Sequence, residues 1–172
     1  MTNADITPST KVRDLLIKYP ELEDKLIAMA PPFKKLKNPI LRNSIGRVAT
    51  MKHISAVSGI PLNELINKIR EAIGLQPTAD SYKDENYFLD QPEWFSKERI
   101  VLSFNEEKLD NKNQMTIVTI LLEAKKVKKG EIIELITSFL PAPGIDLLKA
   151  KGYSVWTKKL ENGIIKSYFL KN

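Results

Sequence analysis

The spacing of apolar residues changes along this chain, and the change limits the folds open to it. Before residue 75 the apolar residues recur at helical spacing, most clearly as Leu62, Leu65, Ile66, Ile69 and Ile73. From Arg99 they alternate as in a strand, as Ile100, Leu102 and Phe104. The sequence therefore predicts the α+β class: an all-helical first part, then a part of mixed helix and strand.

Prolines and glycines divide the first part into short helices. Helices are expected to begin at Thr10, Pro20, Thr50 and Pro61, with shorter ones at 33–37 and 39–43 and a bend near Gly46. Gly74 is a natural end for the last of them. Residues 6–74 thus predict a small helical bundle with short connections.

The second part predicts a two-layer α/β sandwich in the order βαβαββ. After the strand at residues 100–104 we expect a helix at 114–126, a strand at 131–138, the loop Phe139–Gly144 and a helix at 145–151. Asn162-Gly163 lies between two alternating runs, 153–160 and 163–171, which is a strong hairpin signal. The predicted domains are residues 1–75 and 98–172.

Residues 76–97 read as an acidic linker. They carry five acids and two bases. They also contain the aromatic residues Tyr82, Tyr87, Phe88, Trp94 and Phe95. Exposed aromatics are costly in water, so we expect the linker to dock on one or both domains. Stacking on nucleobases is the weaker alternative, because the acidic residues repel phosphates.

The segment of residues 31–50 concentrates positive charge. No acid occurs between Asp24 and Glu64, so the charge is expected to be unneutralised. The candidate anion-binding residues are Phe33, Lys34, Lys35, Lys37, Arg42 and Arg47, with Leu36 adding to an apolar wall. A solvated face of the bundle and a dock for the acidic linker at Asp80–Glu93 are the alternatives.

The chain contains no cysteine, which excludes disulfides, thiolate nucleophiles and cysteine-ligated metals. With His53 as the only histidine, no metal site and no cofactor are expected. The N-terminus does not resemble a signal peptide, and the longest apolar run, near Met115–Leu122, is far short of the ~20 residues of a membrane span. These features favour a soluble cytoplasmic protein with no membrane partner.

Residues 53–70 partly imitate a DNA-binding helix-turn-helix, with Gly59 in the turn. The second helix, however, carries Glu64 and Glu71, and its only bases are Lys68 and Arg70. A helix that reads a DNA groove usually presents more basic and amide groups. Nucleic acid is therefore an alternative partner, behind a small anionic ligand or a protein.

The second half contains the run KKGEIIELITSFLPAPGIDLLKAKGYSVWTKKLENGIIKSYFLK. This run resembles the TusA/SirA-like sulfurtransferase superfamily, in a branch of unknown function, over roughly Arg99–Lys171. The Cys-Pro motif that carries persulfide in that family falls on Asn113 and Gln114. The resemblance implies the family's fold without its sulfur-carrier activity.

The first half contains PPFKKLKNPILR followed by GRVAT, ahead of the last two expected helices. Most of residues 7–74 resemble a bacterial helical domain of unknown function. A relative of that domain stands at the N-terminus of RIC/ScdA-type iron–sulfur-cluster repair proteins, where cysteines are present. The resemblance implies a two-domain architecture and brings no established activity.

The sequence thus favours a non-enzymatic binding or regulatory protein with no catalytic residue, which binds a small anionic ligand or a protein partner. An enzyme remains the second alternative. Its site would lie at Asn113 and Gln114, beside a loop formed by Phe139, Pro141 and Pro143. That loop follows a strand, where α/β sheets commonly bind ligands.

Overall fold

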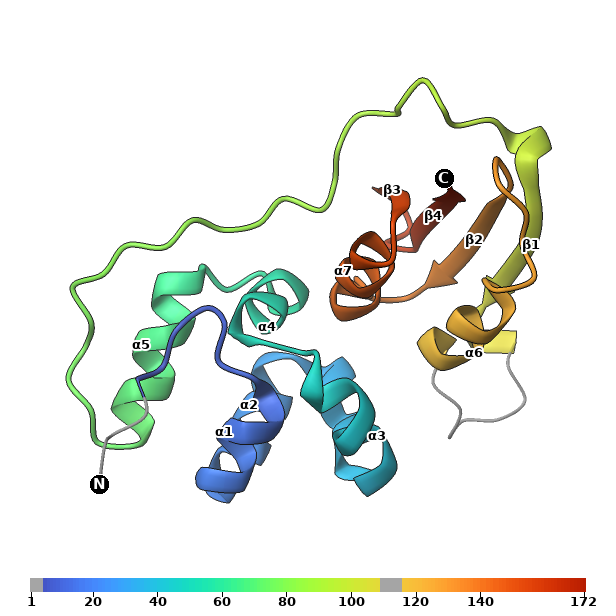
Figure 1. Cartoon of the computed structure of the whole chain (residues 1–172). Helices are drawn as coiled ribbons and strands as arrows, with labels where there is room; N and C mark the ends of the chain where they lie inside the picture. Colours follow the sequence, from blue (N-terminus) through green and yellow to red (C-terminus); the bar gives the residue numbers. More distant parts are fainter. Residues whose placement is uncertain (1–4, 109–115) are drawn as a thin grey trace. The chain divides into compact units, whose positions relative to one another are not determined.

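The computed structural model describes residues 5–108 and 116–172. The chain forms two compact units, the first ending at Glu85 and the second beginning at Asn86 (Figure 1). This division falls inside the stretch that was expected to link two domains. The structure is of mixed α+β class, with the helices of the first unit preceding a four-stranded mixed sheet, as the sequence predicted.

The first unit is all-helical. Its α-helices are α1 (Val12–Lys18), α2 (Glu23–Met29), α3 (Pro39–Ser44), α4 (Met51–Ser58) and α5 (Leu62–Ala72). Three 3-10 helices connect them: Pro20–Leu22, Pro31–Lys37 and Ile45–Arg47. Proline opens two of these connections because its fixed φ suits a first helical position. Gly59 ends α4 at a φ of 75°, a conformation that favours glycine.

Of two predicted helix starts, the one at Thr50 is confirmed and the one at Thr10 is wrong. Thr50 precedes α4 as expected, and its backbone N–H donates to Nδ1 of the buried His53 at 3.0 Å. Thr10 does not cap α1, since Lys11 occupies the cap position. The hydroxyl oxygen of Thr10 instead accepts the backbone N–H of Thr7 at 2.9 Å. The side-chain oxygen of Thr10, which was expected to cap α1, is therefore used in the turn that precedes the helix.

One apolar core unites the helices of the first unit. Its most deeply buried side chains include Leu22, Leu26, Met51, Ile54, Leu65, Ile66 and Ile69. The residues of α5 among them follow the helical spacing seen in the sequence. The opposite face of α5 is polar and lies outside this core.

The second unit contains a four-stranded sheet and two α-helices. In chain order its elements are β1 (Ile100–Asn105), α6 (Thr116–Glu123), β2 (Ile132–Thr137), α7 (Ala142–Ala150), β3 (Tyr153–Lys159) and β4 (Ile165–Lys171). The strand order is β1-β2-β4-β3. β1 and β2 are parallel, whereas β4 is antiparallel to both β2 and β3. The predicted hairpin is present, and Gly163 in its turn has a φ of 83°.

α7 begins earlier than the sequence predicted. It starts at Ala142, with Pro141 at the cap position, so Pro143 and Gly144 belong to its first turn. The expected helix start at Ile145 is therefore wrong, and the FLPAPG run is a short connection rather than a six-residue loop. Proline within the first helical turn costs no hydrogen bond, because those N–H groups have no partner inside the helix.

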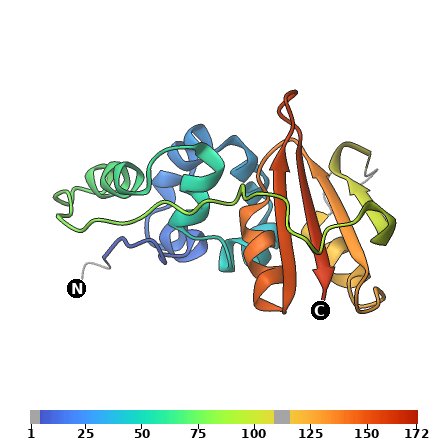
Figure 2. The same ribbon diagram turned by 90° about the horizontal axis from the view of Figure 1, so that it is seen from above.

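The sheet has two differently covered faces. Ile133 and Phe169 are register partners, are fully buried and point to the face covered by the helices. The opposite face holds a cluster of Ile132, Trp156, Tyr168 and Leu170. Trp94 and Phe95, which precede β1 in the chain, pack against this cluster. Figure 2 shows the segment before β1 crossing β3 and β4.

Specific contacts fix this crossing segment. The indole N–H of Trp156 donates to the carbonyl oxygen of Leu89 at 3.0 Å, and the hydroxyl of Tyr87 donates to Asp146 of α7 at 3.0 Å. The ring of Phe95 lies edge-on to Trp156 and to Tyr168, with centroid distances of 4.6 and 4.5 Å. Tyr87, Trp94 and Phe95 therefore dock on the second unit, in agreement with the expectation that the linker docks on one or both domains.

No helix in the described ranges, 5–108 and 116–172, is both long enough and apolar enough to cross a membrane.

Replacing Phe95 by alanine is expected to destabilise the second unit by roughly 2 kcal/mol, because two edge-on aromatic contacts and part of the cover of the sheet are lost. Urea unfolding followed by tryptophan fluorescence measures the effect, since both tryptophans belong to this unit. The matched control is Leu89→Ala, whose side chain is 59% exposed. Equal midpoints for the two variants would show that Phe95 is not part of the core.

Candidate functional site

Part of the anion site predicted in the basic segment, residues 31–50, is buried or already paired. Phe33 and Leu36 are buried on the 3-10 helix Pro31–Lys37 and belong to the core. They therefore cannot form the exposed apolar wall of a ligand site. Lys34, Lys35 and Arg47 are exposed.

Two of the basic side chains are neutralised by acids from α2. Arg42 forms an ion pair with Glu23 at 2.5 Å, and its Nε also donates to the carbonyl oxygen of Leu36. Lys37 forms an ion pair with Asp24 at 3.0 Å. The expectation of unneutralised charge is wrong at these positions. Glu23 and Asp24 are the last acids before the acid-free stretch, and the short connections between helices place them next to its basic side chains.

The acidic segment, residues 76–85, docks on α5 instead of on the basic stretch. The side-chain amide of Asn63 bonds both backbone groups of Tyr82: its Oδ1 accepts the N–H at 2.9 Å and its Nδ2 donates to the carbonyl at 3.4 Å. One turn further along α5, Oδ1 of Asn67 accepts the N–H of Thr78 at 2.9 Å. Asparagine side chains four residues apart thus stand in for a neighbouring strand.

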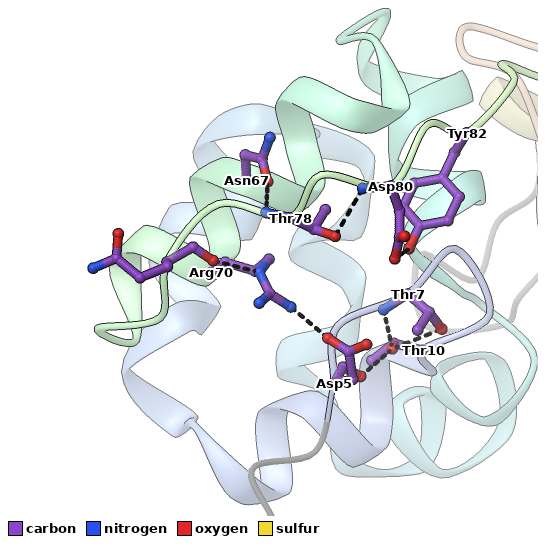
Figure 3. A network of polar contacts seen from close by, with 9 residues as sticks. Asp5, Thr7, Thr10, Asn67, Arg70, Thr78, Asp80 and Tyr82 are labelled. Carbon is purple, nitrogen blue, oxygen red and sulfur yellow. Dashed lines mark hydrogen bonds and ion pairs between the residues drawn. The ribbon is translucent and has the colours of Figure 1, made fainter.

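Arg70 continues this row of side chains. Its Nε donates to the carbonyl oxygen of Gln76 at 2.7 Å, and its Nη1 pairs with Asp5 near the N-terminus. Figure 3 shows these contacts with that of Asn67. We call Asn63, Asn67 and Arg70 the amide-binding face of α5. It satisfies the backbone of an extended chain without requiring particular side chains.

Two contacts recognise acidic side chains. Pro61 occupies the cap position of α5 and has no side-chain acceptor, so the N–H of Leu62 donates to Oδ1 of Asp84 at 2.7 Å. The positive end of the helix dipole favours this carboxylate. Beside it, Lys52 of α4 forms an ion pair with Glu85 at 2.8 Å.

The hydroxyl of Tyr82 donates to Asp80 at 3.0 Å (Figure 3). Desolvation and the bond to Asp80 raise the pKa of this phenol, so Tyr82 remains neutral there. The whole contact is therefore made from neutral amides, one helix end and two cationic side chains. This suits an extended, acidic polypeptide.

The helix-turn-helix alternative depends on the same side of α5. Of the two bases of α5, Lys68 forms an ion pair with Glu64 at 2.7 Å. Asn63, Asn67 and Arg70 are further polar groups that α5 could present to a DNA groove. All three are bonded to the acidic segment. His53 is buried and bonded to Thr50, which gives it a structural role at the start of α4.

The predicted site in the second unit is not an open loop. Asn113 and Gln114 lie outside the described residues. Phe139, Pro141 and Pro143 are half-buried, and the carbonyl oxygen of Phe139 accepts the hydroxyl of Thr137 at 2.6 Å. The structure thus describes three of the five predicted residues and places them between the end of β2 and the first turn of α7.

Sequence reasoning missed a polar cluster on the second unit's sheet. Glu134, in the middle of the apolar strand β2, accepts the hydroxyl of Ser103 at 2.6 Å and pairs with Lys166 at 3.0 Å. Burial acts to raise the pKa of Glu134, but the bonds from Ser103, Lys166 and Tyr168 outweigh it and lower that pKa. Burial and the nearby Glu134 raise the pKa of Tyr168. The sequence signal for this cluster was Glu134 itself, an acid within the otherwise apolar run of β2.

Comparison with known proteins gives one match. Residues 6–66 match the family model described as a domain of unknown function, DUF1858. The match covers the helical unit from its N-terminal turn into α5. No curated protein and no solved structure matches the chain.

Replacing Asp84 by alanine is expected to cost about 1 kcal/mol of helical-unit stability, because α5 loses the acceptor at its first turn. The amide NMR signals of Leu65 and Ile69 during urea unfolding report on this unit alone. Asp90→Ala, in the second unit, serves as the control. An equal effect of both substitutions would contradict a capping role for Asp84.

Replacing Glu134 by glutamine is expected to reduce the sensitivity of the second unit to acid. The folded-state pKa of Glu134 lies below its ordinary value of 4.5. Its stabilisation is therefore fully present above that pH and is lost as the pH falls through the lowered value. Urea midpoints from tryptophan fluorescence, measured from neutral to acidic pH, should fall less steeply for Glu134→Gln than for wild type or the exposed-site variant Glu161→Gln. Parallel curves for all three would contradict this.

Proposed function

We propose that this chain is a non-enzymatic binding protein whose helical unit takes an acidic protein partner in extended conformation. The observation that carries the proposal is the set of hydrogen bonds between α5 and residues 76–85. Asn63 bonds both backbone groups of Tyr82. The start of α5 binds the acid two residues later, and Lys52 binds the acid three residues later. In this structure the chain's own segment fills the site.

The same contacts favour a polypeptide over the other partners considered. Backbone recognition by side-chain amides requires a chain with alternating N–H and C=O groups, which a small anion lacks. Nucleic acid would have to displace the acidic segment, whose backbone occupies Asn63, Asn67 and Arg70. Of the cations proposed for a small anion, Arg42 and Lys37 are already paired with Glu23 and Asp24.

We further propose that the second unit is a TusA/SirA-like domain without sulfur-carrier activity. Its support is the order β1-α6-β2-α7-β3-β4 with the sheet order β1-β2-β4-β3, together with the resemblance of its sequence. The absence of cysteine removes the only residue that could carry persulfide. It also suits a reducing compartment such as the cytoplasm. The two units would then join a peptide receptor to a second binding domain.

The test is a labelled peptide with the sequence of residues 76–86, titrated into the whole chain. A tethered segment has an effective concentration of about millimolar, so the wild-type chain should bind the free peptide poorly. The double variant Asp84→Ala/Glu85→Ala weakens the tethered segment and leaves the receptor residues intact. Fluorescence anisotropy should show at least about tenfold tighter binding to this variant than to wild type.

Two controls make the result specific. A peptide with alanine at the positions of Asp84 and Glu85 should not bind the double variant. Adding Asn63→Ala to that variant should abolish binding of the acidic peptide. Absence of binding to the double variant, or equal binding of the alanine peptide, would overturn the proposal.

A further inference from the structure

Two lysines face each other on the sheet of the second unit. Lys158 of β3 and Lys166 of β4 are direct register partners in the antiparallel pair. The next register pair on the same face is Trp156 and Tyr168. Like charges placed directly opposite each other on neighbouring strands destabilise a sheet. The surroundings of the two ammonium groups therefore need an explanation.

Lys166 already has an anionic partner, Glu134. Its ammonium group pairs with Glu134 at 3.0 Å, and the Lys166 side chain is 28% exposed. The same carboxylate also accepts hydrogen bonds from the hydroxyls of Ser103 and Tyr168. With three donors converging on it, Glu134 has little capacity left for a second cation.

Lys158 lies over aromatic rings instead. Its Nζ is 5.2 Å from the ring centroid of Trp156 and 5.8 Å from that of Tyr168. In the part of the chain that the structure describes, no carboxylate pairs with this half-buried lysine. Aromatic faces attract a cation but compensate its charge only in part. The ammonium group of Lys158 thus keeps a positive charge that its neighbours compensate only in part.

The aromatic rings beneath Lys158 are closely packed. The rings of Trp156 and Tyr168 are stacked with centroids 5.2 Å apart, and Phe95 packs edge-on against both. A lysine held in this way has already lost part of its conformational freedom. An anion that binds it pays less ordering entropy than one that binds a free surface lysine.

We propose that Lys158 and Lys166 form an oxyanion site for a phosphate group on the face of the sheet that carries Trp156 and Tyr168. A dianion at this register pair is attracted by Lys158, whose charge no carboxylate in the described ranges compensates, and by Lys166, whose ammonium group has three donors of which the pair with Glu134 uses one. Lysine acts as a compact point charge, which suits a phosphate approached from two sides. The site lies in the second unit and is independent of the peptide contact on α5.

The test titrates inorganic phosphate into the whole chain at constant ionic strength, with chloride as the reference salt. Backbone amide NMR signals at the ends of β3 and β4, around Lys158 and Lys166, should shift with phosphate and not with chloride. Lys158→Gln should weaken binding at least about tenfold. This variant leaves all three partners of Glu134 in place, so it is expected to fold; its NMR spectrum verifies that.

Lys159→Gln is the matched control. It removes a lysine from the adjacent position of β3, which points to the opposite face of the sheet, and it should bind phosphate like wild type. Glycerol phosphate distinguishes the source of the group: binding equal to that of free phosphate indicates a phosphorylated molecule, and selective binding of inorganic phosphate indicates the free ion. Either result supports the site.

Three results would overturn the proposal. They are amide shifts no larger with phosphate than with chloride, unchanged affinity in Lys158→Gln, and acetate binding as tight as phosphate binding. The last would show that the lysines respond to any anion rather than to a dianion.

Discussion

The extended segment 76–85 can lie on the helical unit only because α5 satisfies its backbone. An extended chain has N–H and C=O groups that need partners, and here no neighbouring strand supplies them. Asn63, Asn67 and Arg70 do so from successive turns of one helix face. The opposite face of α5 is buried in the core. One helix therefore both builds the helical unit and fixes the path by which the chain leaves it.

The contact is reciprocal, because the segment also completes the unit. The first turn of α5 begins after a proline with no side-chain acceptor, and Asp84 supplies it. A free helix end of this kind attracts an anionic side chain from whatever chain lies beside it. The segment's contribution to stability and the unit's capacity to bind an acidic chain thus arise from the same groups. An acidic partner would satisfy both needs.

Much of the fold could be predicted from the sequence. The spacing of Leu65, Ile66 and Ile69 gave the core face of α5, and Asn162-Gly163 gave the hairpin. The charge of the basic stretch was predicted wrongly because its ion-pair partners, Glu23 and Asp24, precede the acid-free part of the sequence. Short 3-10 connections bring the two acids next to Arg42 and Lys37 in the fold. Sequence spacing does not reveal such tertiary pairing. Asn63 and Asn67, four residues apart on a helix, were the visible sign of the site.

The central claim is that α5 recognises an extended acidic chain that can be exchanged. The most direct measurement is hydrogen exchange of the whole wild-type chain with and without free peptide of residues 76–86, supplied well above the roughly millimolar effective concentration of the tethered segment. The account predicts that the Tyr82 amide, bonded to Asn63, loses protection when the peptide displaces the tethered segment, while the Ile133 amide in the second unit's sheet is unchanged. Protection of Tyr82 that does not respond to the peptide would contradict it.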